Sequence, residues 1–259
     1  MLPGRELIEE IERTLYGLEA DEWELSEKLE EFILEKTEGI PFFIEEFIKS
    51  LKDLKIIERE DNRYSMTKDI REVTVPATVQ DVIMARIDSL LEEIKSLLQT
   101  ASAVGREFSY ELIKRVTGLP EQELLSDLSA LKDSELLYER GIYPETTYIF
   151  KHALTREVVY DSILTTRKKK LHELIGNAAE ELYKENIDEH YEVLAGHFIY
   201  SENYEKGAEY SRLAGKKAAK SGSLNDAISY VQKRIACLEK LPVTDDLQKK
   251  IIDARTALG

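Results

Sequence analysis

One stretch decides how the C-terminal third of the chain folds: Leu194-Ala195-Gly196-His197-Phe198-Ile199-Tyr200-Ser201-Glu202-Asn203-Tyr204-Glu205-Lys206-Gly207-Ala208. Leu194 and Phe198 are four residues apart, so they share one face of a helix. Asn203 is a residue that favours a turn, and it separates this helix from the next. Gly207 and Ala214 then put small side chains where the second helix would touch the first. The stretch therefore predicts a pair of helices joined by a short turn.

The same reading extends from residue 165 to residue 259. Helices are expected near 168–184, 189–201, 204–220, 225–241 and 245–258. Their spacing and small residues match the tetratricopeptide pattern of stacked helical hairpins. A single repeat of this kind cannot bury its apolar face alone, so neighbours must stack on it. This segment is expected to form a tetratricopeptide-like α-solenoid.

The middle segment, 63–164, has a different order of elements. Val75-Pro76-Ala77 breaks the chain, and Thr78 can cap the helix that follows. Three further helices are expected, one ending near Gly105 and the others at 109–116 and 121–131. Two short strands, at 136–140 and 147–150, flank a turn. Helices followed by a hairpin are the order of a winged-helix domain.

The first segment, 1–62, is expected to be helical. Apolar residues recur at helical spacing before Gly39, which can end one helix. Pro41 can occupy the first turn of the next helix, where its missing N–H costs nothing. Phe43 and Phe47 continue a buried stripe, and Ile56-Ile57-Glu58-Arg59 is interpreted as a short strand or a helix exit.

Composition narrows the possible partners and compartments. The 259 residues carry a formal net charge of -15, which opposes binding to nucleic acid. Cys237 is the single cysteine, so no internal disulfide can form. Residues 1–20 contain no apolar signal-peptide core, and no apolar run is long enough to cross a bilayer. We expect a cytoplasmic location and no membrane partner.

Motifs for catalysis or metal binding are missing from the sequence. GxxxxGK[ST], GxGxxG and GxSxG do not occur. His172-Glu173 begins an HExxH zinc motif, but Gly176 stands where the second histidine is needed. The four histidines lack metal-site spacing, and His197 is expected to pack inside the repeats. We expect no catalytic residue, no metal site and no enzymatic activity.

A DNA-binding regulator is the alternative function. Arg167-Lys168-Lys169-Lys170 is a dense basic run, interpreted here as the solvated start of a helix. A winged helix reads DNA through its third helix. That helix would expose acidic residues that repel phosphates, namely Glu121, Glu123, Asp127 and Asp133. Packing against protein is therefore the expected role, and nucleic acid is not an expected partner.

Three stretches together resemble one protein family, and they occur in that family's order. They are Thr37-Glu38-Gly39-Ile40-Pro41-Phe42-Phe43-Ile44-Glu45-Glu46, Val75-Pro76-Ala77-Thr78-Val79-Gln80-Asp81-Val82-Ile83-Met84-Ala85-Arg86-Ile87-Asp88, and Phe150-Lys151-His152-Ala153-Leu154-Thr155-Arg156-Glu157-Val158-Val159-Tyr160. The first resembles the GxP signature in the helical lid of STAND signalling ATPases, and the others resemble the start and end of their winged-helix domain. The branch most similar to this chain lies beside nucleotide cyclases and in MalT-like regulators.

The resemblance implies a mainly α fold: a helical lid bundle (1–62), a winged-helix domain with a small β-hairpin (63–164), and the repeats (165–259). It also implies that a P-loop domain precedes this part and binds ATP or ADP with Mg²⁺ in the parent protein. Pro41 matches the lid proline that packs near the nucleotide base. His152 matches the winged-helix histidine that reaches the β-phosphate in the ADP state.

Two questions stay open at this stage. Lys151 and Ala153 flank His152 where the family has Met and Asp, so a phosphate contact and a packing role are both retained for His152. Met1 begins either a cloned fragment, which we favour, or a protein that has lost its ATPase part. In either case, we expect the chain to be a regulatory and protein-interaction module. We expect it to be a monomer or a weak dimer. Its partners would be the parent's P-loop domain and a protein, peptide or small inducer on the repeats.

Overall fold

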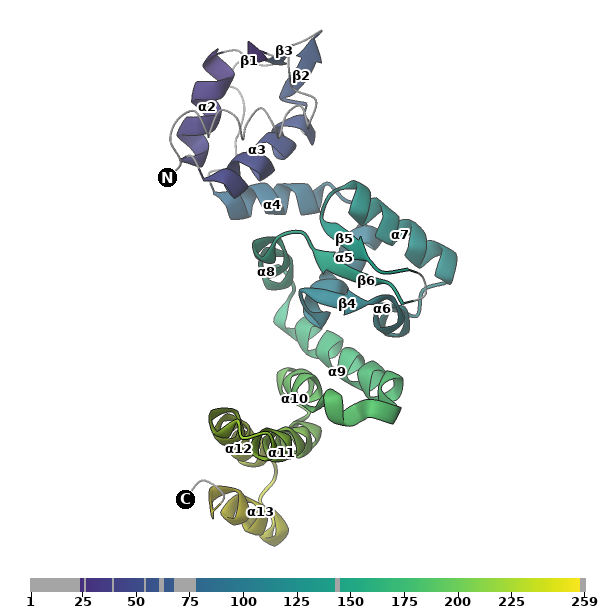
Figure 1. The fold of residues 1–259 in the computed structure, drawn as a ribbon, viewed down its shortest axis with the longest axis vertical. Coiled ribbons are helices and arrows are strands. Elements are labelled where there is room, and N and C mark those ends of the chain that lie inside the picture. Colours follow the sequence, from purple (N-terminus) through teal and green to yellow (C-terminus); the bar gives the residue numbers. More distant parts are fainter. Residues whose placement is uncertain are drawn as a thin grey trace. The chain divides into compact units, whose positions relative to one another are not determined.

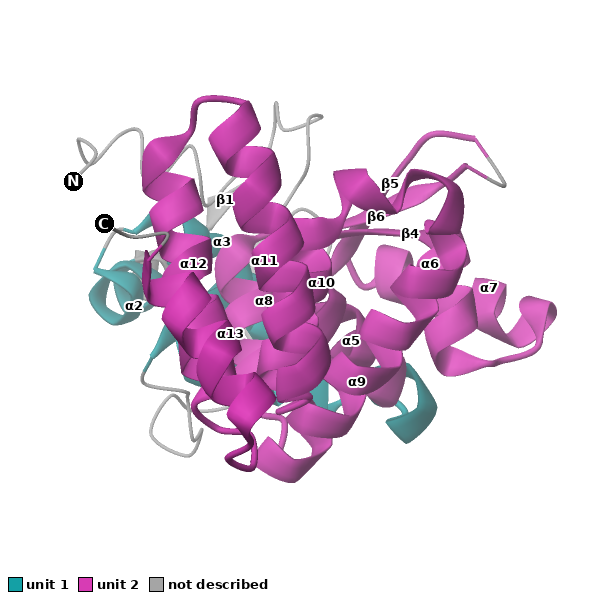
Figure 2. Ribbon diagram, turned by 90° about the horizontal axis from the view of Figure 1, so that it is seen from below, with its two compact units in different colours: residues 1–95 teal, residues 96–259 magenta. Residues whose placement is uncertain are grey.

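The computed structural model describes residues 24–25, 27–38, 40–53, 55–60, 63–67, 78–142 and 145–256. The fold is mainly helical, as the sequence predicts, with two small three-stranded sheets (Figure 1). The chain divides into two compact units, residues 1–95 and residues 96–259, which Figure 2 distinguishes by colour. Among the described residues, none of the helices combines the length and apolarity needed to cross a membrane.

The first unit pairs two helices with a small sheet. Its elements are β1 (Glu24–Leu25), α2 (Glu27–Thr37), α3 (Pro41–Asp53), β2 (Ile57–Glu60) and β3 (Arg63–Met66). The strands lie in the order β1-β3-β2, and β2 pairs antiparallel with β3. Of the stretch Ile56-Ile57-Glu58-Arg59, the last three residues lie in strand β2, and Ile56 precedes it. Gly39, expected to end the first helix, lies outside the described residues, whereas its neighbour Glu38 has the left-handed φ of 50°.

Helix α4 (Val79–Asp88) also belongs to the first unit. Thr78 caps it as expected, because its hydroxyl accepts a hydrogen bond from the Asp81 N–H. Val82 of α4 is fully buried in one apolar cluster with Leu29 of α2 and Phe47 of α3. The boundary expected between residues 62 and 63 therefore lies inside this unit, between the paired strands β2 and β3.

Helix α5 (Glu92–Val104) leads into the second unit. There follow β4 (Glu107–Ser109), α6 (Tyr110–Thr117), α7 (Glu121–Asp133), β5 (Leu137–Arg140), β6 (Thr147–Phe150) and α8 (Ala153–Asp161). The strands lie in the order β4-β6-β5, and both pairings are antiparallel. The two predicted strands are confirmed, and the short strand β4 was missed.

Local chemistry explains where these elements begin and end. Ser109 ends β4 and caps α6, its hydroxyl accepting from the Leu112 N–H. Gly118 closes α6 in the left-handed conformation, with φ of 64°, where a side chain would be strained. Phe108 of β4 stacks on Tyr148 of β6 at 5.8 Å between ring centroids. Cross-strand aromatic pairs of this kind stabilise short strands.

The remaining helices are α9 (Thr165–Leu182), the 3-10 helix η3 (Lys184–Glu189), α10 (Tyr191–Tyr200), α11 (Tyr204–Lys220), α12 (Leu224–Leu238) and α13 (Asp245–Thr256). All five predicted helices are confirmed, with ends that shift by up to three residues. Asn203 caps α11 by accepting from the Lys206 N–H. Gly207 lies where an added Cβ would come within 3.1 Å of Ile199, so a small residue is needed as α11 crosses α10.

Candidate functional site

Pro41 is the first residue of α3, and its ring is exposed. This is the helix-start position expected for a proline. Behind it, Phe43 and Phe47 are buried and meet edge to face at 5.9 Å. Pro41 belongs to the first unit and His152 to the second.

A buried ion pair joins the first two stretches that carry the family resemblance. Arg86 of α4 donates through Nη1 to the carboxylate of Glu46 of α3, both within the first unit. The two side chains are 7% and 1% exposed. Removing one partner of such a pair leaves an uncompensated buried charge, which costs about 3–5 kcal/mol. The pair therefore holds α4 on α3.

His152 precedes the first residue of α8 and has an extended backbone, with φ of -126° and ψ of 140°. Its side chain is half-buried and makes no capping hydrogen bond to the helix. The preceding Lys151 reaches Glu135 at 3.0 Å, so the residue that departs from the family pattern is engaged within the second unit. The role of His152 toward a nucleotide stays a prediction.

The basic run at the start of α9 is largely engaged in contacts within the second unit. Arg167 donates to the Ser96 hydroxyl at 2.8 Å, and Lys169 pairs with Glu202 at 2.8 Å. Lys168 lies over the Tyr160 ring at 4.3 Å. On α7, Glu121, Glu123 and Asp133 are exposed and Asp127 is half-buried. These contacts and charges favour the helix-start interpretation over a nucleic-acid interface.

A chain of buried polar side chains links α8, α9 and α10 in the second unit. Tyr160 Oη lies 2.8 Å from His172 Nε2, and His172 Nδ1 lies 2.8 Å from His197 Nδ1. His172 and His197 are 5% and 6% exposed. We call Tyr160, His172 and His197, together with Arg156, the histidine junction.

Arg156 extends the histidine junction to α5. Its Nε donates to the carbonyl oxygen of Ser102 at 2.8 Å, while its guanidinium lies over the Tyr160 ring at 4.8 Å. Tyr200 covers the other side, stacking on His172 at 4.9 Å between ring centroids. The junction thus connects α5 and α8, in the segment expected to be a winged helix, with α9 and α10 of the expected repeats.

Both imidazoles of the histidine junction are held neutral. Burial, together with the nearby cations Arg156 and Lys168, lowers the pKa of His172 to about 4. Burial and the adjacent His172 lower the pKa of His197 to about 3. A contact between two Nδ1 atoms needs one N–H and one lone pair, which two neutral rings of suitable tautomer supply. Two imidazolium ions would bring N–H against N–H and break the contact.

Apolar packing surrounds the histidine junction. Phe198 of α10 is fully buried and stacks on Tyr210 of α11 at 5.6 Å. Leu112 of α6 belongs to the same cluster, so the sheet-bearing part and the later helices share a core. Gly176 of α9 lies so close to Phe198 that an added Cβ would come within 2.9 Å of the ring. A small residue is therefore needed at Gly176, where α9 packs against Phe198 of α10.

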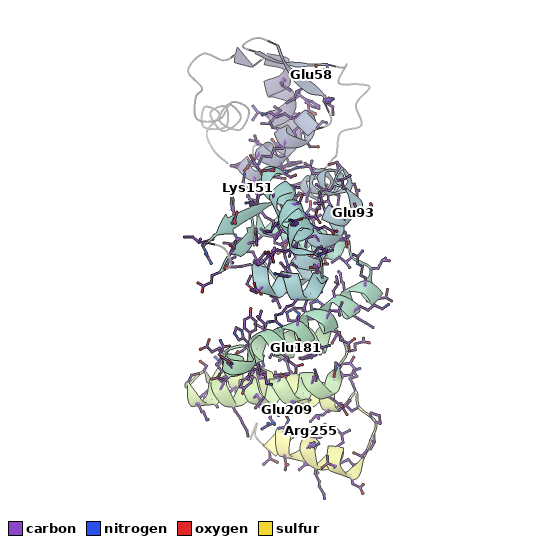
Figure 3. All side chains as sticks on the ribbon, turned by 90° about the vertical axis from the view of Figure 1, so that its right-hand side faces the viewer. Glu58, Glu93, Lys151, Glu181, Glu209 and Arg255 are labelled. Carbon is purple, nitrogen blue, oxygen red and sulfur yellow. The ribbon has the colours of Figure 1, made fainter. Side chains whose placement is uncertain are left out.

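A groove of about 550 Å³ lies at the other end of the second unit, among α11, α12 and α13. Ala208, Leu238 and Leu247 form part of its floor, and all three are buried. Arg255 of α13 pairs with Glu239, just beyond α12, at 2.8 Å and so fixes α13 against α12. Figure 3 labels Glu209 on α11 and Arg255 on α13. We call this space the α11–α13 groove.

The charged residues of the α11–α13 groove are unevenly compensated. Arg212 donates twice to Glu209, at 2.9 and 2.5 Å, and Lys250 pairs with Asp246 at 2.7 Å. Within the described part of the chain, Arg234 has neither a hydrogen bond nor an ion pair through its side chain. Burial lowers the pKa of Arg234, and the neighbouring Arg212 lowers it further. The carboxylates of Glu209 and Asp253 act on the pKa of Arg234 in the opposite direction, so nearby anions offset part of this effect without a direct ion pair.

The sequence patterns found neither the histidine junction nor the α11–α13 groove. His197 was expected to be a packing residue, and it does pack, but its contact with His172 was not expected. The two residues lie 25 positions apart on different helices, so no local sequence spacing links them. Arg234 is one of many charged residues, and only the tertiary fold shows that it faces a groove.

Comparison with known proteins adds one match and one negative result. A family described as a domain of unknown function (DUF8739) matches residues 22–65, which include β1, α2, α3, β2 and all of β3 except Met66. No curated protein matches the chain.

Proposed function

We propose that this chain is a non-catalytic regulatory and protein-interaction module of a signal-transduction ATPase. In this proposal, the module couples the nucleotide state of a P-loop domain to the binding of a ligand or partner. The observation that carries the proposal is the histidine junction, because it ties α5 and α8 to α9 and α10 through buried contacts. A binding event on the later helices then has a physical connection to the part around the sheet.

The arrangement of the elements supports the two domain types in this proposal. The order α5-β4-α6-α7-β5-β6, with sheet order β4-β6-β5, is consistent with a winged helix. Helices α10 to α12 are joined by short turns and have small residues at their crossings, as tetratricopeptide-like repeats require. Repeats of this kind supply binding surface without needing catalytic groups.

The contacts at the histidine junction support coupling more than catalysis. Its two imidazoles are buried and bonded to each other, and they are neutral at physiological pH because their pKa values lie far below it. A general base works best with a pKa near the operating pH and with access to its substrate. The junction instead has the properties of a packed polar link, which responds when one of its helices moves.

Nucleotide binding would need the missing P-loop domain. The sequence lacks a phosphate-binding loop. In the parent protein, Pro41 is proposed to pack near the base and His152 to approach the phosphates.

Calorimetric titration with ADP and with Mg²⁺-ATP tests this proposal. The titrations use this chain and a version extended N-terminally through the P-loop domain that the family resemblance implies. We expect binding only to the extended protein, and weaker ADP binding in its His152→Ala variant. Tight binding or turnover of nucleotide by this chain alone would overturn the non-catalytic assignment. If His152→Ala binds ADP as tightly as the unsubstituted protein, the phosphate-sensing role is wrong.

A further inference from the structure

We infer that the histidine junction is a proton-operated latch: it holds α10 on α9 while its imidazoles are neutral, and it releases α10 when both are protonated. This inference goes beyond the proposed function, because it names a signal to which the connection between α8 and α10 responds. It depends on the direct contact between two imidazole nitrogens and on the charges that surround them.

The contact between the two rings limits how many protons the closed junction can hold. His172 Nδ1 and His197 Nδ1 lie 2.8 Å apart, so one nitrogen must carry a proton and the other must offer its lone pair. One extra proton on the pair still leaves a lone pair between the rings. Two extra protons leave none, and two N–H groups would then face each other. The second proton therefore enters only if His197 separates from His172.

The charges closest to the junction oppose a proton on either ring. Arg156 of α8 lies over the Tyr160 ring at 4.8 Å, and Lys168 of α9 lies over the same ring at 4.3 Å. Asp161 pairs with Lys168 at 3.5 Å, but its side chain is 79% exposed, so water weakens the compensation. An imidazolium in the closed junction would thus lie among like charges.

The other helices packed on the junction present neutral groups to it. Helix α5 faces Arg156 with the carbonyl oxygen of Ser102, and α10 covers His172 with the ring of Tyr200. Burial and the neighbouring positive charges place the pKa of His172 at about 4, and burial with His172 and Arg156 places the pKa of His197 at about 3. The closed junction is therefore the neutral form.

Falling pH should shift the junction toward its open form. Imidazoles exposed to water have a pKa near 6.5, whereas both rings have much lower pKa values in the closed junction. Between pH 6.5 and pH 4, the open form thus binds up to about two more protons than the closed form. Each proton changes the equilibrium by up to about tenfold per pH unit, so both together give up to about a hundredfold. The contact is complete above pH 6.5 and is lost as the pH falls toward 4.

The test measures the distance between α8 and α10 in the full chain by double electron–electron resonance. Spin labels are attached at Glu157→Cys and Val193→Cys, two exposed positions, in a background with Cys237→Ala. We expect one distance at pH 7.5 and a second, longer distance that grows as the pH falls from 6.5 to 4.5. The ratio of the two populations should change by more than tenfold per pH unit, which one titrating group cannot produce.

Substitution of the imidazoles identifies the groups that take up the protons. His197→Gln keeps a side chain that can hydrogen-bond but removes one titrating ring, so the ratio should change by about tenfold or less per pH unit. The double variant His172→Gln with His197→Gln should not respond over this range. His190→Gln is the matched control, because His190 stacks on Tyr183 outside the junction, and should respond like the unsubstituted chain.

Three outcomes overturn the inference. The first is a single, unchanged distance down to pH 4.5. The second is a double variant that responds to pH as the unsubstituted chain does. The third is a loss of helical circular dichroism with the same pH midpoint as the distance change, because the chain would then unfold as a whole in acid.

The latch and the proposed function can fail separately. If the distance does not respond to pH while the nucleotide titrations of the extended protein behave as expected, the regulatory proposal stands and only the latch is refuted. If the distance responds as expected but the extended protein binds no nucleotide, the latch remains a property of this chain and the regulatory proposal is wrong.

Discussion

The histidine junction and the α11–α13 groove lie in the same unit and are both built from helices, yet they handle polar groups in opposite ways. At the junction, His172 and His197 are buried, and His172 contacts both His197 and the half-buried Tyr160. In the groove, Arg234 lines an open space, and the carboxylates of Glu209 and Asp253 act on it without a direct ion pair. The contrast separates polar side chains that bond directly inside the fold from charged side chains that line an open surface. Substitutions at the junction should therefore lower stability more than those in the groove.

The largest effect is expected from Phe198→Ala, which removes a fully buried ring beside the histidine junction. Cavity formation of this kind costs about 3–5 kcal/mol. Urea unfolding followed by circular dichroism measures the loss. Leu241→Ala, at the half-buried rim of the groove, is the control and should cost less. Equal losses in the two variants would remove the distinction between the two regions.

Acidification should weaken the junction by a comparable amount. The folded pKa of His172 is about 4, below the usual 6.5, so the unfolded chain takes up protons first as the pH falls. Stability is then complete above pH 6.5 and is lost as the pH falls toward 4. This difference between the folded and unfolded pKa of His172 corresponds to about 3 kcal/mol in the free energy of unfolding.

Unfolding free energies at pH 7, 5 and 4 measure this dependence. The variant His172→Gln lacks one of the junction's two titrating imidazoles and should show a flatter profile over the same range. An unchanged slope in this variant would mean that other groups carry the pH dependence.

A smaller effect is expected from Tyr160→Phe. The substitution keeps the ring under Arg156 and Lys168 but removes the hydroxyl that meets His172 Nε2. His172 Nε2 then loses its hydrogen-bond partner, and leaving a buried polar atom without one costs about 1–3 kcal/mol. Thermal unfolding should report this loss, and Tyr138→Phe, at an exposed position on β5, is the matched control. No difference between the two variants would contradict the importance of the buried bond.

The smallest effect on stability is expected from Arg234→Gln. The side chain makes no ion pair with another described residue, so its loss should change the unfolding free energy by about 0.5 kcal/mol or less. The same unfolding assay measures it. A loss of unfolding free energy as large as that of Tyr160→Phe would show that Arg234 stabilises the fold.

The sequence predicted the helices well because their signals are local. The pattern from Leu194 to Ala208 located α10 and α11, and Asn203 caps α11 as a turn residue should. Strand β4 was not predicted because its three residues are too few to show the alternation of apolar and polar side chains that marks a strand. Its pairing with β6 arises from contacts between segments about 40 residues apart.

The sites were harder to predict because they are made by tertiary contacts. His172 attracted attention as part of a broken zinc motif, but its partners Tyr160 and His197 come from other helices. Arg86 and Glu46, within two of the stretches used for the family resemblance, form an ion pair that their local patterns do not reveal. Pairing of this kind depends on how helices cross, which hydrophobic spacing alone does not specify.

The most direct test of the coupling role is native-state hydrogen exchange. The exchange rates of the amides in residues 96–256 are measured at several urea concentrations, all below the unfolding transition. If the histidine junction couples its helices, amides of α5, α8, α9 and α10 should open together at one free energy. In the double variant Tyr160→Phe with His197→Gln, opening of α9 and α10 should separate from that of α5 and α8. Independent opening already in the unsubstituted chain would contradict the account.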